Sequence, residues 1–393
     1  MANGSADLTR GAQFLLTASS EPGDSRRAGI NYPGLLESVK KGDLLHLADG
    51  LIRLRVDGIE RNGVLCTVLV GGTLSSGKGV NAPGVPMKVE YPTPADVEHL
   101  MFGLGQEVDF VAASFIRTAA DLRALRRLMP LDGPSLIAKI EKREALQNFE
   151  EILTEADGIM VARGDLGIEV PIQTVPAIQK QIIRKCSKVG KPVIVATQML
   201  VSMVNFPVPT RAEVTDVSTA ILDGTDAVML SDETTVGKYP VETVKVLDKI
   251  IRATEKSPES FLRTWVESET RDTAEAIGRA ACRLADYVGA KAIVAPTQTG
   301  STARRVAMCR PAQPIVAMCT DPRIARRMKL FRGVVPVLSR KAKTMDWLFA
   351  RADVAALRLG LAKKGDRIVV TSGTPGKKGT TNLIRVSVVG GPS

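Results

Sequence analysis

The segment that decides the fold spans residues 136–169 and reads LIAKIEKREALQNFEEILTEADGIMVARGDLGIE. Its pattern predicts a strand over 136–141, a helix over 143–154 and a second strand over 158–165. A helix between two strands makes them parallel, because the chain must cross back before it can pair again. The carboxyl ends of both strands then meet at one edge of the sheet, which is where α/β folds bind ligands.

Charged side chains stand at both of these strand ends. Lys139 and Glu141 close the first strand, and Arg163 and Asp165 repeat the spacing at the second. Side chains two residues apart on a strand lie on the same face, so each pair should point in one direction. We therefore expect two carboxylates and a lysine to converge at this edge of the sheet.

The converging groups fit a metal site that handles charged substrates. Glu141 and Asp165 offer hard oxygen ligands, which suit Mg²⁺ or Mn²⁺; without a metal the two carboxylates would repel. Lys139 could neutralise charge developing on a phosphoryl group or an enolate. Gly164 permits close backbone approach, and the amides after it could hold a carboxylate or phosphate at a helix start. The alternative is a buried Lys–Glu–Asp ion network without catalytic meaning.

The chain resembles the pyruvate kinase family in five motifs that occur in the family's order. They are IAKIE at 137–141, DGIMVARGDLGIE at 157–169, GKPVIVATQML at 190–200, PTRAEVTDV at 209–217 and LDGTDAVMLSDET at 222–234. The resemblance extends over about residues 7–389. It implies phosphoryl transfer from phosphoenolpyruvate to ADP, giving pyruvate and ATP in the last step of glycolysis. It further implies Mg²⁺, K⁺ and an allosteric, cytoplasmic homotetramer.

The resemblance also implies roles for particular residues. Glu141 and Asp165 would be the Mg²⁺ ligands, and Lys139 would stabilise the transition state of phosphoryl transfer. Gly164, Asp165 and Thr197 would contact phosphoenolpyruvate together with Lys139. Thr197 would lie near the enolate carbon that is protonated. A further motif, SFIR at 114–117, we interpret as packing and loop anchoring.

Residues 1–85 are rich in short strands separated by turns that carry Gly and Asp. We expect strands at 13–17, 44–47, 52–56 and 64–70, which together predict a small β-barrel. By the family resemblance this is a lid domain, and its exit loop KGVN places Lys78 against the nucleotide, with Asp49 nearby. The alternative for Lys78 is a solvated loop lysine.

Residues 86–256 alternate between continuous apolar runs and helical patterns, as in a (β/α)₈-type barrel. The expected strands number five rather than eight, at 108–115, 136–141, 159–162, 192–197 and 227–230; helices are expected at 178–189 and 211–222. By the resemblance, about three strands with K⁺ ligands should precede the lid. Because that pattern is not found before residue 7, the barrel is expected to be incomplete at its N-terminus. The 393-residue chain alone is then expected to be a weak or inactive kinase, and the alternative function is a non-catalytic remnant that binds metal and a phosphorylated effector.

Residues 272–393 predict a doubly wound α/β domain. We expect helices at 274–288, 303–309 and 322–330 and strands at 292–295, 315–318 and 367–371. A Thr- and Gly-rich loop between the first strand and the next helix has the geometry of a phosphate cradle. The resemblance makes this loop an allosteric sugar-phosphate or nucleotide site, with a second flap at 371–382, and the alternative is an ordinary Ser/Thr turn. The loop residues are Thr297, Gln298, Thr299, Gly300, Ser301 and Thr302.

The charge and composition of the chain limit the classes of partner that it is expected to bind. The net charge is +11, and from residue 289 onward 20 Lys and Arg face only 4 acids. Nucleic-acid binding is disfavoured, because aromatic residues for base stacking are nearly absent from this basic region. The sequence has no apolar run of about 18 residues and no signal-peptide pattern, and its five cysteines are scattered. These features favour a cytoplasmic protein without a membrane span.

Overall fold

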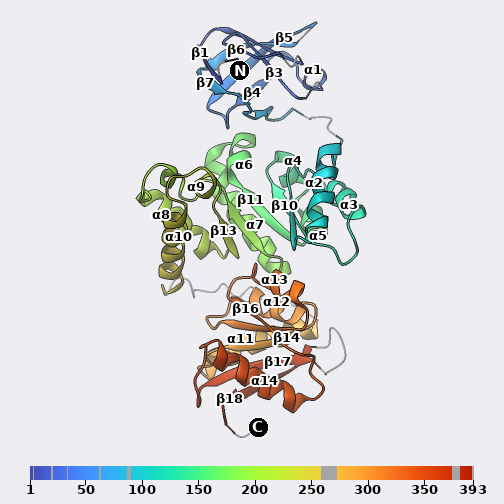
Figure 1. Ribbon diagram of the computed structural model, residues 1–393, viewed down its shortest axis with the longest axis vertical. Helices are drawn as coiled ribbons and strands as arrows, with labels where there is room; N and C mark the ends of the chain where they lie inside the picture. Colours follow the sequence, from blue (N-terminus) through green and yellow to red (C-terminus); the bar gives the residue numbers. More distant parts are fainter. Residues whose placement is uncertain are drawn as a thin grey trace.

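The computed structural model describes residues 1–2, 4–18, 21–32, 34–61, 63–85, 90–257, 272–373 and 381–391. Three regions follow one another along the long axis: a β-rich region, a parallel sheet with helices, and a second α/β sheet (Figure 1). The flap expected over 371–382 lies mostly outside the described residues. In the part of the chain that is described, no helix is long and apolar enough to cross a membrane.

The first region is built from a six-stranded sheet, in the order β3-β2-β6-β5-β4-β8, and a separate β1–β7 pair. Alternation decides its faces: Ile52, Leu54 and Val56 on β5 are buried, whereas Arg53 and Arg55 between them are exposed. The strands predicted at 13–17 and 44–47 are confirmed, and four short strands were missed. The elements are β1 (Ser5–Leu8), β2 (Gln13–Thr17), β3 (Arg27–Gly29), α1 (Leu35–Ser38), β4 (Leu44–Leu47), β5 (Ile52–Glu60), β6 (Gly63–Val70), β7 (Gly72–Ser75) and β8 (Val80–Asn81).

The central region has five parallel strands in the order β13-β12-β11-β10-β9, as the apolar runs predicted. The strands are β9 (Phe110–Ala113), β10 (Ser135–Ile140), β11 (Gly158–Ala162), β12 (Val193–Ala196) and β13 (Ala227–Met229). The helices are α2 (Pro94–Gly105), α3 (Ala119–Arg127), α4 (Arg143–Gln147), α5 (Phe149–Glu155), α6 (Arg163–Glu169), α7 (Val175–Val189), α8 (Arg211–Asp223), α9 (Asp232–Thr235) and α10 (Pro240–Glu255), with 3-10 turns η1 (Ile172–Thr174) and η2 (Val201–Val204).

Two predicted elements in the deciding segment need correction. The single helix over 143–154 is two helices, because Asn148 leaves helical geometry and its side chain donates to the Arg117 carbonyl at 3.0 Å. The second strand ends at Ala162, as the apolar run at 159–162 predicted and not at 165, and α6 begins at Arg163. The charged residues after Ala162 therefore belong to a helix start, not to a strand.

The sheet has two faces with different cores. Leu136, Ala138 and Ile140 point to the face that the helices cover, where they join the largest buried cluster. Ile137 alternates with them and packs with Met160 and Ile194 on the other face. Lys139 is the next residue of β10 on that second face. It therefore lies just beyond the apolar layer, at the carboxyl end of the strand.

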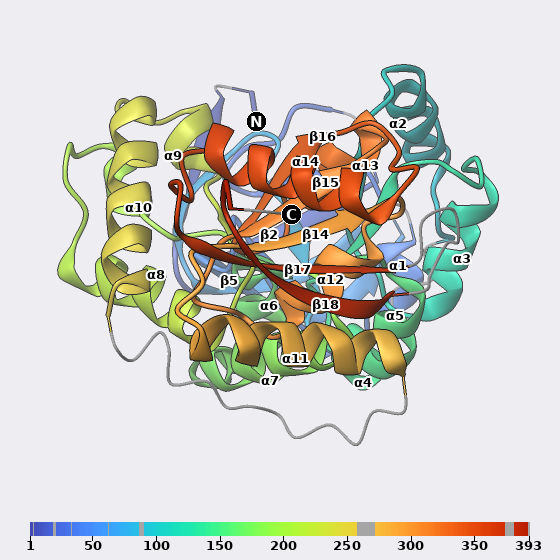
Figure 2. The ribbon, with the colours of Figure 1, turned by 90° about the horizontal axis from the view of Figure 1, so that it is seen from below.

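The last region is a five-stranded sheet in the order β16-β15-β14-β17-β18, parallel except for β18. Helix α14 packs against one face and α11 with α12 against the other, so the domain is doubly wound as predicted (Figure 2). Strands β16 and β18 and helix α14 were not predicted. The elements are α11 (Thr273–Tyr287), β14 (Ile293–Thr297), α12 (Ser301–Met308), β15 (Ile315–Cys319), α13 (Pro322–Met328), β16 (Val334–Leu338), α14 (Met345–Arg358), β17 (Arg367–Gly373) and β18 (Thr381–Val388).

A buried ion pair joins the last region to the amino-terminal end of the central sheet. Asp226, just before β13, accepts two hydrogen bonds from Arg310 at 2.6 and 2.8 Å. The same carboxylate accepts the amides of Val193 and Arg332, and its side chain is only 4% exposed. Leu330 adds an apolar contact, because it packs against the second face of the sheet. Charge and apolar packing thus fix the two α/β regions together.

We predict that Asp226→Asn lowers the free energy of unfolding by about 3 kcal/mol, because it leaves the Arg310 charge buried without its counter-ion. Asp132→Asn is the matched control, since Asp132 meets Arg323 at 3.2 Å on the surface with 76% of its side chain exposed. That change should cost less than about 1 kcal/mol. Chemical denaturation of both variants measures the difference, and equal losses would contradict the role of Asp226.

Candidate active site

Lys139 and Glu141 form the centre of the site. Lys139 Nζ lies 2.6 Å from Glu141 Oε1, so the two side chains point the same way as predicted. Glu141 is almost fully buried, with 1% of its side chain exposed. Burial raises the pKa of Glu141, the ion pair with Lys139 opposes that rise, and the charge of Asp165 adds to it. The charge of Asp165 is therefore felt at Glu141, which is consistent with the two carboxylates lying at the same edge of the sheet.

The turn after β9 holds this pair in place. Lys139 Nζ donates to Ser114 Oγ at 2.8 Å, and the Phe115 amide donates to Glu141 Oε2 at 2.8 Å. Phe115 takes a left-handed conformation with φ 56°, which turns its amide toward the carboxylate. The sequence assigned Ser114 and Phe115 to packing and loop anchoring, so their polar contacts to Lys139 and Glu141 were missed. The signal was available, because the ends of neighbouring parallel strands meet at one edge.

Gly164 and Thr197 lie together at the ends of β11 and β12. The register pairs Ala162 with Ala196, so β11 and β12 end at the same level of the sheet. The Gly164 amide donates to Thr197 Oγ1 at 2.8 Å, and that hydroxyl donates to the Ala196 carbonyl at 2.7 Å. A Cβ at Gly164 would meet Thr197 Oγ1 at 3.5 Å, an ordinary contact. The protein's own packing does not demand glycine there, and room for a ligand remains the predicted reason.

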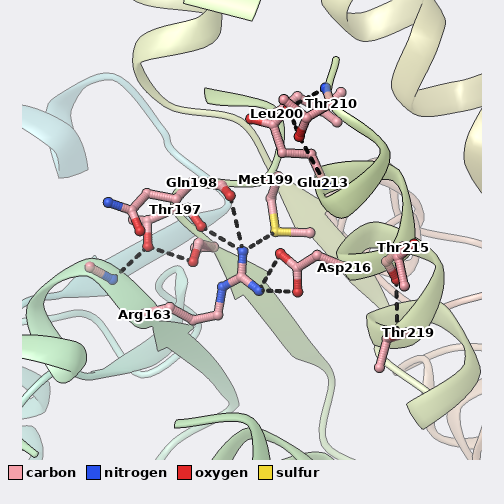
Figure 3. Close-up of polar contacts among 12 residues, drawn as sticks. Arg163, Thr197, Gln198, Met199, Leu200, Thr210, Glu213, Thr215, Asp216 and Thr219 are labelled. Atoms are coloured by element: carbon pink, nitrogen blue, oxygen red, sulfur yellow. Dashed lines mark hydrogen bonds and ion pairs between the residues drawn. The ribbon is translucent and has the colours of Figure 1, made fainter. Parts of the chain in front are cut away.

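The side chains of Arg163 and Asp165 do not point in one direction, and that part of the prediction is wrong. Its Nη1 lies 2.7 Å from Asp216 of α8, and its Nη2 donates to the Thr197 carbonyl at 2.8 Å (Figure 3). The reason is the helix start at Arg163: residues two apart on a helix point about 200° apart, whereas on a strand they share a face. Asp165 lies in the first turn of α6, where its charge suits the positive end of the helix.

Thr197 and Gln198 are strained at the end of β12. Both take left-handed backbone conformations, with φ 70° and 55°. For a β-branched residue such as Thr197 this costs on the order of 1–3 kcal/mol, so surrounding contacts must enforce it. The Arg163 contacts to the carbonyls of Thr197 and Gln198 supply such a constraint.

The donor set fits a hard divalent cation. Among the described residues no group of three or more His, Cys, Asp or Glu could hold a metal, and Glu141 with Asp165 stays the predicted ligand pair. Mg²⁺ commonly takes one or two protein carboxylates and fills its remaining positions with water and substrate oxygens. Two carboxylates at the edge of a sheet match that requirement.

The turn Ala48–Gly50 of the β-rich region lies close to the central region. Residues Ala48, Asp49 and Gly50 all have positive φ, between 50° and 84°, and a Cβ at Gly50 would lie 3.8 Å from Ile168 of α6. Lys78 is exposed between β7 and β8. The lid thus lies over the end of the sheet that carries the charged residues (Figure 1).

The predicted phosphate loop connects β14 to α12. Gly300 has φ 84° and precedes the first residue of the helix. Thr302 Oγ1 lies 2.9 Å from Thr381 Oγ1 of β18, and Thr299 Oγ1 donates to Ser301 Oγ at 3.2 Å. The buried hydroxyls of Thr297 and Thr371 have no hydrogen-bond partner among the described residues. Gln298 is half-buried in the same loop. Hydroxyls from three strands and a helix start are therefore gathered at one place.

A parallel sheet whose carboxyl edge carries a lysine and two acids beneath a β-rich lid defines an α/β enzyme of the barrel class. The sequence matches the family described as the barrel domain of pyruvate kinase over residues 1–244 and the pyruvate kinase alpha/beta domain over 275–387. The chain belongs to the pyruvate kinase family.

Similar proteins cover nearly all of the chain. A pyruvate kinase of Clostridium acetobutylicum is 42% identical over 98% of this chain and 82% of its own length. The pyruvate kinase of Thermotoga maritima is 44% identical, with 97% and 82% covered. That of Geobacillus stearothermophilus is 43% identical, with 99% of this chain and 68% of the relative covered.

Proposed function

We propose that this chain transfers the phosphoryl group of phosphoenolpyruvate to ADP, giving pyruvate and ATP. The observation that carries the proposal is the buried pair Lys139–Glu141, at 2.6 Å, beside Asp165 at the carboxyl edge of the sheet. Phosphoryl transfer requires positioning and charge stabilisation more than covalent chemistry, and this arrangement supplies both. Family membership, with matches over residues 1–244 and 275–387, supports the same reaction.

Glu141 and Asp165 would hold Mg²⁺ or Mn²⁺. The bound metal would neutralise negative charge on the phosphoryl and enolate oxygens. Glu141 is suited to this because Lys139 and the Phe115 amide fix both of its oxygens in direction. A K⁺ ion in the complete site is part of the same proposal, since the family resemblance implies it.

Lys139 would stabilise the transferring phosphoryl group. An ammonium has three N–H donors, and the described residues engage two of them, at Glu141 and Ser114. The third donor is available for a substrate oxygen. Gly164 and Asp165 would contact phosphoenolpyruvate, and Thr197 would lie near the enolate carbon that receives a proton.

The remaining proposals concern the nucleotide, the effector and assembly. Lys78 would contact ADP or ATP when the lid closes over the sheet. The loop Thr297 to Thr302 would bind a sugar phosphate or a nucleotide, since α12 supplies a helix start and the buried hydroxyls of Thr297 and Thr371 have no hydrogen-bond partner among the described residues. We also propose a homotetramer, which rests on family resemblance.

Asp165→Asn should weaken Mn²⁺ binding by more than about tenfold, because one of two charged ligands becomes neutral. Isothermal calorimetry measures the affinity, with Asp132→Asn as a control that removes a surface carboxylate of the same region. The control should change affinity by less than about twofold. Unchanged affinity in Asp165→Asn would remove this residue from the metal site.

Lys139→Met should lower turnover by about 10²–10³-fold while Mn²⁺ still binds, because it removes a charged donor from a largely buried site. Lys180→Met is the matched control, since Lys180 pairs with Asp223 at 2.8 Å between α7 and α8. A coupled assay of pyruvate formation gives the rates. Unreduced turnover in Lys139→Met would refute the role of Lys139. If the unmodified chain binds Mn²⁺ but forms no pyruvate, that result would favour the non-catalytic alternative.

For the basic domain, a sugar phosphate or nucleotide should raise the melting temperature of the full chain. Thr299→Glu should abolish the rise, because a carboxylate would stand where the anion binds. Thr9→Glu places the same charge on the exposed lid and should leave the rise intact. A ligand panel that shifts neither wild type nor variant would leave the loop as an ordinary Ser/Thr turn.

A further inference from the structure

We propose that Arg163 is a positioning residue that holds the Thr197 hydroxyl in place, and that Asp216 holds Arg163 for this task. The inference rests on the proposed function, because Thr197 matters only if substrate binds beside it. Neither Arg163 nor Asp216 needs to touch substrate. Figure 3 shows the guanidinium between Asp216 on one side and the Thr197–Met199 segment on the other.

The first observation is the backbone that Arg163 contacts. Nη2 donates to the carbonyl of Thr197 at 2.8 Å and reaches that of Gln198 at 3.4 Å. These are the two residues that take left-handed conformations at the end of β12. A cationic donor makes stronger hydrogen bonds than a neutral one, so the guanidinium is suited to hold an unfavourable backbone.

The second observation concerns the hydrogen bond between Gly164 and Thr197, because Arg163 is connected to both of these residues. Gly164 follows Arg163 directly, and its amide donates to Thr197 Oγ1 at 2.8 Å. Arg163 therefore ties the first turn of α6 to the end of β12 at two places. The direction of the Thr197 hydroxyl depends on both places being held.

The third observation is how Arg163 itself is anchored. Asp216 of α8 meets Nη1 at 2.7 Å, and the Arg163 side chain is only 12% exposed. Its Nε is buried without a partner among the described residues. The anchoring therefore depends on the terminal nitrogens, and a lysine cannot reproduce such a two-sided contact.

The site is consequently held by two separate sets of contacts. Lys139 and Glu141 depend on the turn after β9, whereas Thr197 depends on Arg163 and α8. Loss of Arg163 should therefore damage the step near Thr197 and spare the metal-binding pair. A purely structural role would instead weaken the whole region.

The direct test is hydrogen–deuterium exchange of the Gly164 amide. In Arg163→Met this amide should exchange about tenfold faster, whereas amides of β10 should keep their protection. Arg163→Lys should lie between the variant and wild type. The control is Arg123→Met, which removes a contact to Glu155 at 3.0 Å elsewhere in the region. This measurement does not depend on turnover.

The functional test follows exchange of the pyruvate methyl protons with D₂O by NMR. In the reverse of enolate protonation a C–H bond breaks, the proton leaves to solvent, and a deuteron returns to the same carbon without net redox change. Arg163→Met should lower kcat for this exchange by about 100-fold, because a small misplacement near the reacting atoms is costly. KM and Mn²⁺ affinity should change by less than about threefold, and adding Asp216→Asn should cost little more.

Wild-type exchange rates in Arg163→Met, or loss of protection throughout the chain, would overturn the inference. A wild-type chain that neither exchanges pyruvate protons nor forms pyruvate would count against the proposed function instead. In that case the hydrogen–deuterium exchange rate of the Gly164 amide still tests whether Arg163 holds Thr197.

Discussion

A carboxylate buried at the end of a strand is the constraint on which the site depends. Glu141 has almost no access to water, and a lone buried charge of this kind would be strongly unfavourable. Lys139 of β10 at 2.6 Å and the Phe115 amide in the turn after β9 at 2.8 Å compensate it. These two contacts also fix the directions of both Glu141 oxygens and of the Lys139 ammonium. The contacts that stabilise the buried carboxylate of Glu141 therefore also fix its direction, which supports the metal and phosphoryl site proposed for it.

The sheet places this pair by separating its two faces. One face is packed under helices, and the other carries Ile137, Met160 and Ile194 before the charged layer begins. At the opposite end, Leu330 packs against the same face and Asp226 binds Arg310. Apolar packing and a buried ion pair thus close the amino-terminal end, while the carboxyl end remains the polar one under the lid.

Helix α6 and the end of β12 form a second unit of the site. Thr197 takes a backbone conformation that is unfavourable for its residue type, and Arg163 makes the contacts that hold it. Strain of this kind persists only where neighbours enforce it, and it is common where a protein positions reacting groups. Strand β11 lies between the two units, because it pairs with β10 on one side and with β12 on the other.

The sequence by itself determined the parallel strands, the doubly wound domain and the Lys139–Glu141 pair, because period-two alternation and strand direction are local properties. It also placed Gly164, Asp165 and Thr197 at one edge. It misplaced Arg163, because a strand that ends at Ala162 and one that continues to Asp165 look alike in an apolar run. Only the tertiary structure decided that Ser114 contacts Lys139 and that Asp216 turns Arg163 toward Thr197. Those contacts join residues far apart in the chain, and their geometry follows from how strands and helices pack rather than from any local pattern.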